Sequence, residues 1–232
     1  MSPWSTQLVA LDVAGTTVEE HSAVYAALRE AVEAAGAPVA DADLAGWMGA
    51  DKREAVAALL AAGGVPAGGA LVEEVLEDFR ARLAAAYAAR PPHPFPGVPQ
   101  ALARLRERGV KVALTTGFDR GVTAGLLDQL GWAVGGEGEG RLDAVVCVDD
   151  VPAGRPAPWM VFRAMEATGT TAVADVLVAG DTPRDLRAGT NAGAGAVVGV
   201  LTGGVPREVL AAEPHTHLLG SVAELPQLLG LA

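Results

Sequence analysis

Cysteine is nearly missing from this chain, since Cys147 is the only one among 232 residues. A single thiol excludes an internal disulfide. Long hydrophobic runs are missing as well: no apolar stretch reaches the ~18 residues of a membrane-spanning helix. Residues 1–6 also lack the basic-then-apolar pattern of a secretory signal. We therefore expect a cytoplasmic protein with no membrane partner.

Positive charge is the second shortage. Lysine and arginine together number 17 against 28 acidic residues, which gives a formal net charge of −11 at neutral pH. Such an acidic balance argues against a nucleic-acid or anionic-membrane partner. Any anionic group that the protein binds must therefore be held by a few local cations. Half of the residues are apolar, which indicates a globular chain with a substantial core.

Two short apolar runs end in carboxylates. The run 8–11 is too short for a helix and leads into Asp12, with Gly15 shortly after it. The run 176–179 leads into Gly180-Asp181-Thr182, with another aspartate four residues after Asp181. In open α/β folds ligands bind where parallel strands end, so these carboxylates are expected at one site. Paired strand-end carboxylates favour a divalent cation there.

The hydrophobic pattern changes twice along the chain. After the first run it is helical over residues 18–92, and Arg90-Pro91-Pro92 marks a stiff end to that stretch. Beyond it strands alternate with helices, which is typical of a parallel, doubly wound sheet. We therefore predict an α/β fold: a core domain of residues 1–17 and 93–232, and an all-helical cap of residues 18–92 inserted after the first strand. The expected core strands are 8–11, 111–116, 144–148, 176–179 and 196–201, and the expected core helices are 98–108, 120–130, 158–167, 183–192 and 222–229.

Four motifs resemble those of the haloacid dehalogenase superfamily, and they occur in the same order. They are Asp12-x-Ala-Gly-Thr16, Thr115-Thr116-Gly117, Arg155 within Gly-Arg-Pro, and Gly180-Asp181-Thr182-x-x-Asp185. Ala14 replaces the second aspartate that is usual in the phosphatases of that superfamily. Together with the stretches 48–52 and 151–160, this makes the chain similar to the phosphonatase (phosphonoacetaldehyde hydrolase) group. The resemblance implies a capped hydrolase that forms a homodimer through its cap helices.

The resemblance also assigns roles to the motif residues. Asp12 is the nucleophile, because a carboxylate can attack phosphorus once the phosphoryl charge is neutralised. Mg²⁺ prefers oxygen ligands, and the implied ligands are Asp12, the backbone carbonyl of Ala14, Asp181 and Asp185. The residues expected to bind the substrate or its phosphate are Thr16, Met48, Gly49, Thr116, Gly117 and Arg155. Asp185 and Thr182 also fit a helix cap, which is compatible with metal binding.

Lysine is scarce in a way that singles out Lys52. The only lysines are Lys52 and Lys111, against 15 arginines. A composition so biased substitutes arginine wherever positive charge alone suffices, so a lysine retained in the cap suggests that an amine is needed. Only an amine can form an imine, and a guanidinium cannot. A solvated lysine, or one that binds substrate charge, is the alternative.

Ala14 favours the same chemistry. A phosphatase must protonate an alkoxide leaving group, and the aspartate that is missing here is the usual donor. An iminium on Lys52 removes that need, because the carbon then leaves as an enamine. The predicted reaction is hydrolysis of the C–P bond of phosphonoacetaldehyde or a related 2-oxoalkylphosphonate through an aspartyl phosphate and a lysine imine. A phosphatase of small phosphate monoesters and a catalytically weak scaffold are the alternatives.

Three positions depart from the phosphonatase pattern and leave the substrate open. Ala55 stands where that group has a histidine, Phe118 where it has a tyrosine, and Ser22 where it has a cysteine. These groups would line the aldehyde pocket and assist proton transfers. A different 2-oxoalkylphosphonate is therefore compatible with the sequence.

Overall fold

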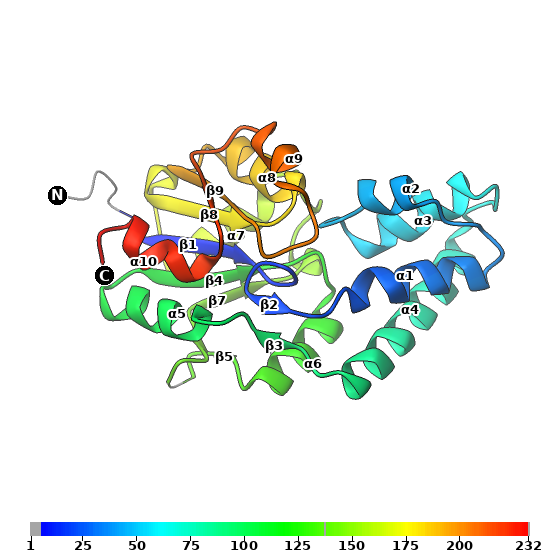
Figure 1. Ribbon diagram of the computed structural model, residues 1–232, viewed down its shortest axis with the longest axis horizontal. Helices are drawn as coiled ribbons and strands as arrows, with labels where there is room; N and C mark the ends of the chain where they lie inside the picture. The colour runs from blue at the N-terminus through cyan, green and yellow to red at the C-terminus, as the bar shows by residue number, and fades with distance from the viewer. Residues whose placement is uncertain (1–5, 137, 232) are drawn as a thin grey trace. The chain divides into compact units, whose positions relative to one another are not determined.

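A computed structural model describes residues 6–136 and 138–231, and the chain divides into two compact units (Figure 1). Unit 1 combines the segments Met1–Glu19 and His93–Ala232, and unit 2 is the segment Glu20–Pro92. Unit 2 thus begins two residues after the position from which the sequence predicts the cap. Val18–Glu19 forms a short strand, β2, that pairs antiparallel with β3 (His93–Pro94), and this pairing keeps both segments in unit 1.

Unit 1 is built on a six-stranded sheet with the order β10-β9-β8-β1-β4-β7, and every pair in it is parallel. All residues of β1, β8 and β9 are buried, as expected for strands covered on both faces. This confirms the predicted α/β class. The strands are β1 (Leu8–Asp12), β4 (Lys111–Thr115), β7 (Ala144–Val146), β8 (Val176–Gly180), β9 (Ala196–Val200) and β10 (His217–Leu219).

Helices cover the sheet on both faces. Leu8 and Ala10 of β1 share a buried cluster with Met160 and Ala164, which lie on α7. Since strand side chains alternate, Val9 and Leu11 face the opposite side of the sheet. The helices of unit 1 are α5 (Val98–Glu107), α6 (Arg120–Leu130), α7 (Trp159–Thr168), α8 (Pro183–Ala192), α9 (Arg207–Ala211) and α10 (Leu225–Leu228).

Short elements account for most differences from the sequence prediction. The strand expected over 144–148 ends at Val146, and a 3-10 turn, Val148–Asp150, follows it. The last helix, expected over 222–229, is a 3-10 turn, Val222–Glu224, and one turn of α10, which has Pro226 near its start. Elements this short contain too few residues to show a hydrophobic period. Other examples are α9, β10 and the two-residue strands β5 (Ala133–Val134) and β6 (Arg141–Leu142).

Unit 2 is helical throughout. Its helices are α1 (Ala23–Ala34), α2 (Asp41–Gly46), α3 (Lys52–Ala62) and α4 (Gly69–Ala89). Val24, Leu28 and Val32 form the buried face of α1, as their spacing predicts. Asp51 caps α3 by accepting a hydrogen bond from the backbone N–H of Arg53 at 2.7 Å. Within the described ranges, no helix has the length and apolar character needed to cross a bilayer.

The register of the sheet brings three strand ends to one edge. Asp12 of β1 lies beside Thr115 of β4, and Leu11 lies beside Ala179 of β8. The residues that follow these strands therefore emerge together at the carboxyl edge of unit 1. The sheet thus positions side chains that lie more than a hundred residues apart in the sequence.

Candidate active site

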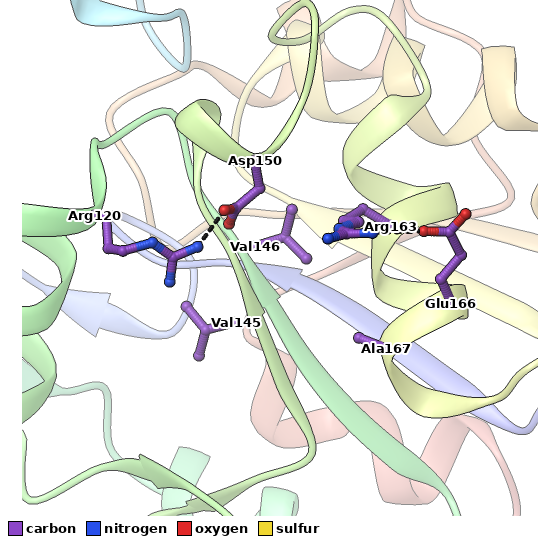
Figure 2. A pocket seen from close by; sticks show the side chains of 7 residues that line it. All are labelled: Arg120, Val145, Val146, Asp150, Arg163, Glu166 and Ala167. Atoms are coloured by element: carbon purple, nitrogen blue, oxygen red, sulfur yellow. Dashed lines mark hydrogen bonds and ion pairs between the residues drawn. The ribbon is translucent and has the colours of Figure 1, made fainter.

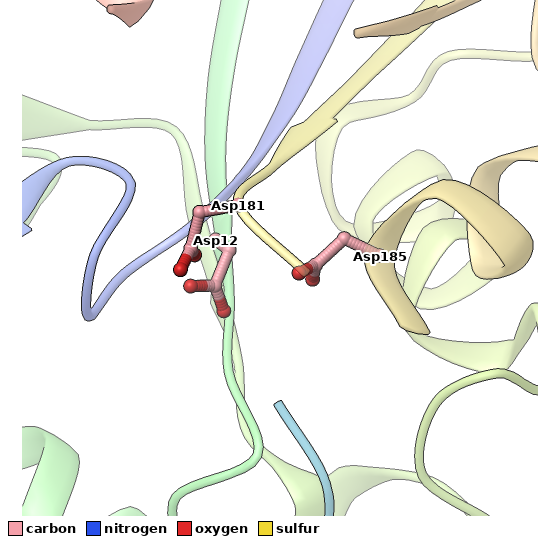
Figure 3. A group of neighbouring side chains, drawn as sticks. All are labelled: Asp12, Asp181 and Asp185. Carbon is pink, nitrogen blue, oxygen red and sulfur yellow. The ribbon is translucent and has the colours of Figure 1, made fainter. Parts of the chain in front are cut away.

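Three buried carboxylates meet at the carboxyl edge of the sheet in unit 1 (Figure 3). Asp12 ends β1, Asp181 directly follows β8, and Asp185 lies in the first turn of α8. Each offers an oxygen atom, and these oxygens all lie within 4.8 Å of one another. None of the three residues is more than 7% exposed. The structure thus brings together the three side chains that the sequence predicts as metal ligands.

Arg155 is the cation that pairs with this group. Its Nη1 lies 2.6 Å from Oδ1 of Asp12 and 2.7 Å from Oδ1 of Asp185. Its Nη2 donates to the backbone oxygen of Thr115 at 2.7 Å and to the hydroxyl at 2.8 Å. The guanidinium is therefore fixed from two sides. Arg155 is itself only 4% exposed, so both partners of each ion pair are buried.

One guanidinium does not balance three carboxylates. Burial raises the pKa of Asp12 to about 6, against the attraction of Arg155, which lowers it. Burial and the neighbouring Asp12 and Asp185 raise the pKa of Asp181 well above its usual range, while a hydrogen bond from Thr16 opposes that change. Burial lowers the pKa of Arg155, but Asp185 and Asp12 outweigh this and raise it overall. The site as folded therefore favours additional positive charge.

A divalent cation fits this donor set. All three side chains offer oxygen, the ligand atom that Mg²⁺ and Ca²⁺ prefer. A bound cation would also oppose the upward shifts of these pKa values, since a nearby positive charge lowers a carboxyl pKa. The three carboxylates could thus hold a metal ion.

The loop after β1 is folded tightly against Asp181. Gly15 has a φ of +85°, a left-handed conformation that favours glycine. A Cβ atom at Gly15 would lie 2.6 Å from Oδ2 of Asp181, so the close approach also requires glycine. The hydroxyl of Thr16 donates to Oδ1 of Asp181 at 2.8 Å. Thr16, predicted as a substrate-binding residue, therefore contacts a predicted metal ligand directly.

Asp185 has two functions in the fold. Its Oδ2 accepts a hydrogen bond from the backbone N–H of Thr182 at 3.0 Å, which caps α8, and its Oδ1 faces Arg155. Gly180 leaves room for it, because a Cβ atom there would lie 2.2 Å from Cγ of Asp185. The capping role considered from the sequence thus exists alongside the cluster.

The residues after β4 are placed at the same edge. Thr116 and Gly117 are buried between the end of β4 and the start of α6. The Thr116 hydroxyl accepts a hydrogen bond from the N–H of Phe118 at 3.1 Å. Asp119 caps α6 by accepting a hydrogen bond from the N–H of Val122. Gly117 therefore lies in the connecting loop.

Lys52, Met48 and Gly49 belong to unit 2. Lys52 is the first residue of α3 and is 8% exposed, and its ammonium group donates to the backbone oxygen of Ala50 at 2.9 Å. Met48 is half-buried, and the N–H of Gly49 donates to the hydroxyl of Tyr25 at 3.3 Å. These three residues therefore form one local group around the start of α3.

The other lysine has a different environment. Lys111 is exposed at the start of β4, and its ammonium group lies 3.4 Å from a carboxylate oxygen of Asp143. Burial of a lysine desolvates its charged group, which costs free energy. Lys52 is therefore the lysine whose position requires an explanation.

The three positions that depart from the phosphonatase pattern differ in environment. Ala55 is fully buried on α3, one turn beyond Lys52, and Phe118 is 3% exposed. Ser22 is exposed and has a left-handed backbone, with a φ of +60°. Neither Ala55 nor Phe118 carries a group that can transfer a proton.

Two contacts to the site come from residues that the sequence analysis missed. Thr115 supplies both acceptors for Nη2 of Arg155. Thr202, in the turn after β9, donates its hydroxyl to the backbone oxygen of Gly15 at 2.6 Å. A sequence signal existed, because Thr202-Gly203 follows a buried strand as Thr116-Gly117 does.

A separate hollow in unit 1 adds no second anion site. It encloses about 300 Å³ (Figure 2). Arg120 pairs there with Asp150, and Arg163 lies 2.9 Å from Glu166, so both guanidiniums are already neutralised. None of its residues is a predicted site residue. The residues that line it are Arg120, Val145, Val146, Asp150, Arg163, Glu166 and Ala167.

Comparison with known proteins identifies similar sequences. The family model of haloacid dehalogenase-like hydrolases matches residues 6–193. A phosphonoacetaldehyde hydrolase of Parabacteroides distasonis is 35% identical, over 57% of this chain and 57% of that protein. A protein of the same name from Bacillus cereus is 36% identical, over 57% of this chain and 47% of its own. The chain spans about half the length of the curated relatives it matches.

Solved structures share the fold. A hydrolase from Pseudomonas syringae has a TM-score of 0.83 at 21% identity, with 96% of this chain and 97% of that chain covered. A phosphonoacetaldehyde hydrolase-like protein from Oleispira antarctica has a TM-score of 0.79 at 22% identity, with 97% and 92% covered. At these identities the likeness is evidence of the fold alone.

The ion pairs of Arg155 generate a stability prediction. Arg155→Met should lower the free energy of unfolding by about 3–5 kcal/mol, because it leaves Asp12 and Asp185 buried without their cation. Urea unfolding in EDTA at pH 8 measures this without a metal that could compensate. Arg163→Met is the matched control: its exposed pair with Glu166 should change stability by less than about 1 kcal/mol. Equal stability of the two variants would contradict the prediction.

Proposed function

This chain belongs to the haloacid dehalogenase-like hydrolases, since their family model matches residues 6–193, and on that premise we propose that it hydrolyses a C–P bond. The proposed substrate is phosphonoacetaldehyde or a related 2-oxoalkylphosphonate, and the proposed cofactor is Mg²⁺. The names of the curated relatives support this substrate class. Because the chain spans about half their length, the choice of substrate class is also argued from the residues of this chain.

The observation that carries the proposal is the burial of Lys52. Lys111 is exposed and paired with a carboxylate, whereas Lys52 is buried at the start of α3 in a chain with 15 arginines. A buried primary amine costs desolvation, and arginine would be the common replacement here if charge were all that was needed. An amine that must act as a nucleophile explains its retention.

The proposed reaction begins at the carbonyl carbon of the substrate. The neutral amine of Lys52 attacks this carbon, and loss of water gives an iminium. The C–P bond then breaks while an oxygen of Asp12 bonds to phosphorus, and the electron pair of the broken bond enters the iminium to form an enamine. The enamine carbon that carried phosphorus takes up a proton, which regenerates an iminium, and water hydrolyses this iminium to the free aldehyde or ketone and Lys52. A second water hydrolyses the aspartyl phosphate, which frees Asp12 and inorganic phosphate.

The residues of unit 1 would hold the phosphoryl group and the cation. Arg155, Thr116 and Gly117 are the proposed phosphate-binding residues. Asp12, Asp181, Asp185 and the Ala14 carbonyl are the proposed metal ligands. When bound, Mg²⁺ would neutralise charge between Asp12 and the phosphoryl group. Arg155 keeps Asp12 oriented, since it is bonded to both the carboxylate and the end of β4.

One contact favours a second candidate, a phosphatase of small phosphate monoesters. Nζ of Lys52 donates to the Ala50 carbonyl at 2.9 Å, a contact that a charged ammonium group can make. A permanently charged Lys52 would bind substrate charge and form no imine. Ala14 weighs against this reading, because no aspartate is present at that position to protonate an alkoxide.

The carboxylate cluster predicts an absolute metal requirement. EDTA should abolish phosphate release from a 2-oxoalkylphosphonate, and Mg²⁺ should restore it. Asp12→Asn should lower turnover by at least about 10³-fold, because the amide is a poor nucleophile, with an unchanged circular dichroism spectrum. Full activity in EDTA would contradict the proposed metal-dependent mechanism.

Ala14 predicts poor cleavage of ordinary esters. Phosphate release from unactivated sugar phosphates should be roughly 10²–10⁴-fold slower than from the best 2-oxoalkylphosphonate, because general acid catalysis is missing. Ala14→Asp should raise ester cleavage, since it supplies the acid. Efficient turnover of several sugar phosphates by the unmodified chain would instead support the phosphatase.

Lys52 should form a covalent imine. Borohydride added with a 2-oxoalkylphosphonate should leave a stable adduct on the Lys52 peptide, detected by mass spectrometry. Lys52→Arg keeps the charge, so it should bind the phosphonate but lose C–P cleavage. Lys111→Arg is the matched control and should keep both the adduct and the turnover. If Lys52→Arg retained most of its turnover, charge alone would suffice and the phosphatase would replace the C–P hydrolase.

A further inference from the structure

The turn that follows β9 contacts the candidate metal site at two points. The hydroxyl of Thr202 donates to the backbone oxygen of Gly15 at 2.6 Å. The next residue, Gly203, lies against Asp181: a Cβ atom on Gly203 would be 1.8 Å from Oδ2 of that carboxylate. A side chain at position 203 could not be accommodated unless Asp181 moved. This turn belongs to none of the four motifs in the sequence.

Two glycines pack against Asp181. A Cβ atom at Gly15 would lie 2.6 Å from Oδ2, the same oxygen that Gly203 approaches. The hydroxyl of Thr16 holds Oδ1 at 2.8 Å. Since Thr202 bonds to the Gly15 carbonyl, the β9 turn and the loop after β1 form a closed clamp around this side chain.

We propose that Thr202 and Gly203 are positioning residues that orient Asp181 and the loop after β1 for cation binding. This inference rests on the metal site of the proposed function. Residues that hold metal ligands without touching the metal typically contribute 10–100-fold to affinity. The strand order explains why the turn after β9 can reach Asp181, because β9 is the neighbour of β8 and β8 leads into Asp181.

The Thr202 hydrogen bond also acts on a second proposed ligand. Gly15 directly follows Ala14, whose backbone carbonyl is a proposed metal ligand. Anchoring the Gly15 carbonyl fixes the peptide that follows this ligand and limits the rotation of the Ala14 carbonyl. Thr202 would therefore restrain a backbone ligand, whereas Gly203 restrains a carboxylate.

Mn²⁺ binding to the metal-stripped chain of 232 residues tests the proposal without reference to turnover. The free ion is measured by electron paramagnetic resonance. Thr202→Val should weaken binding by about 10-fold, and Gly203→Ala by about 10–100-fold. Thr202→Ser retains the hydroxyl and should bind as the unmodified chain does. Turnover of Thr202→Val should recover at saturating Mg²⁺, because the hydroxyl affects binding of the cation and not the chemical step.

Two matched controls separate positioning from general damage. Thr168→Val removes a half-buried hydroxyl that donates to the Ala164 carbonyl at 2.8 Å, at the end of α7. Gly125→Ala adds a Cβ atom in open space on α6. Both controls should bind Mn²⁺ normally. The metal-free melting temperature of each variant shows whether it is folded. If Gly203→Ala does not fold, Mn²⁺ binding by Thr202→Val alone tests the positioning role.

The outcomes distinguish this inference from the proposed function. If the unmodified chain binds no Mn²⁺, the metal site itself fails and the inference falls with it. If the unmodified chain binds Mn²⁺ and Thr202→Val binds it equally well, the positioning role is overturned while the metal site stands. Weaker binding by Thr202→Val with rescue by Thr202→Ser supports the clamp.

Discussion

The placement of three carboxylates around one buried guanidinium is the constraint on which unit 1 depends. Asp12 and Asp185 share Arg155, while Asp181 is held by Thr16 and two glycine backbones. Burial raises the pKa of Asp12 to about 6 and raises that of Asp181 well above its usual range, so the folded protein bears an electrostatic cost at this edge. Such a cost is common at functional sites, where the missing charge arrives with a ligand. The parallel sheet makes the arrangement achievable, because adjacent strands in register end together.

Much of this arrangement could be predicted from the sequence, because it depends on local signals. A short apolar run that ends in a carboxylate indicates a buried strand and its tip, so Asp12 and Asp181 could be identified without knowledge of their neighbours. Thr202-Gly203 after a buried strand is a signal of the same kind, but the contact that Thr202 makes could not be predicted. Its partner, the Gly15 carbonyl, is a backbone group with no sequence signature, and the contact requires β9 to lie beside β8. Strand order is a property of the whole sheet, and the local pattern of residues 196–201 does not contain it.

The interpretation of Lys52 shows how composition and structure contribute separately. The bias toward arginine marks both lysines as unusual, but it cannot distinguish them. Burial does so, since Lys111 is exposed beside Asp143 and Lys52 is 8% exposed. Structure in turn adds a contact that composition could not reveal, the hydrogen bond to Ala50. An ammonium group in that contact must lose a proton before the amine can attack a carbonyl.

Ala14 and Lys52 are best understood as one change in chemistry. Cleavage of a phosphate ester places negative charge on a leaving oxygen, and an acid must neutralise it. Cleavage of a C–P bond places the electron pair on carbon, where a positioned acid is of little use and a conjugated cation is needed. A chain that lacks the aspartate at position 14 and retains a buried amine at position 52 is suited to the second demand. The phosphoryl half of the reaction is the same in both cases, which is why Asp12, Arg155 and Asp181 alone do not distinguish a phosphatase from a C–P hydrolase.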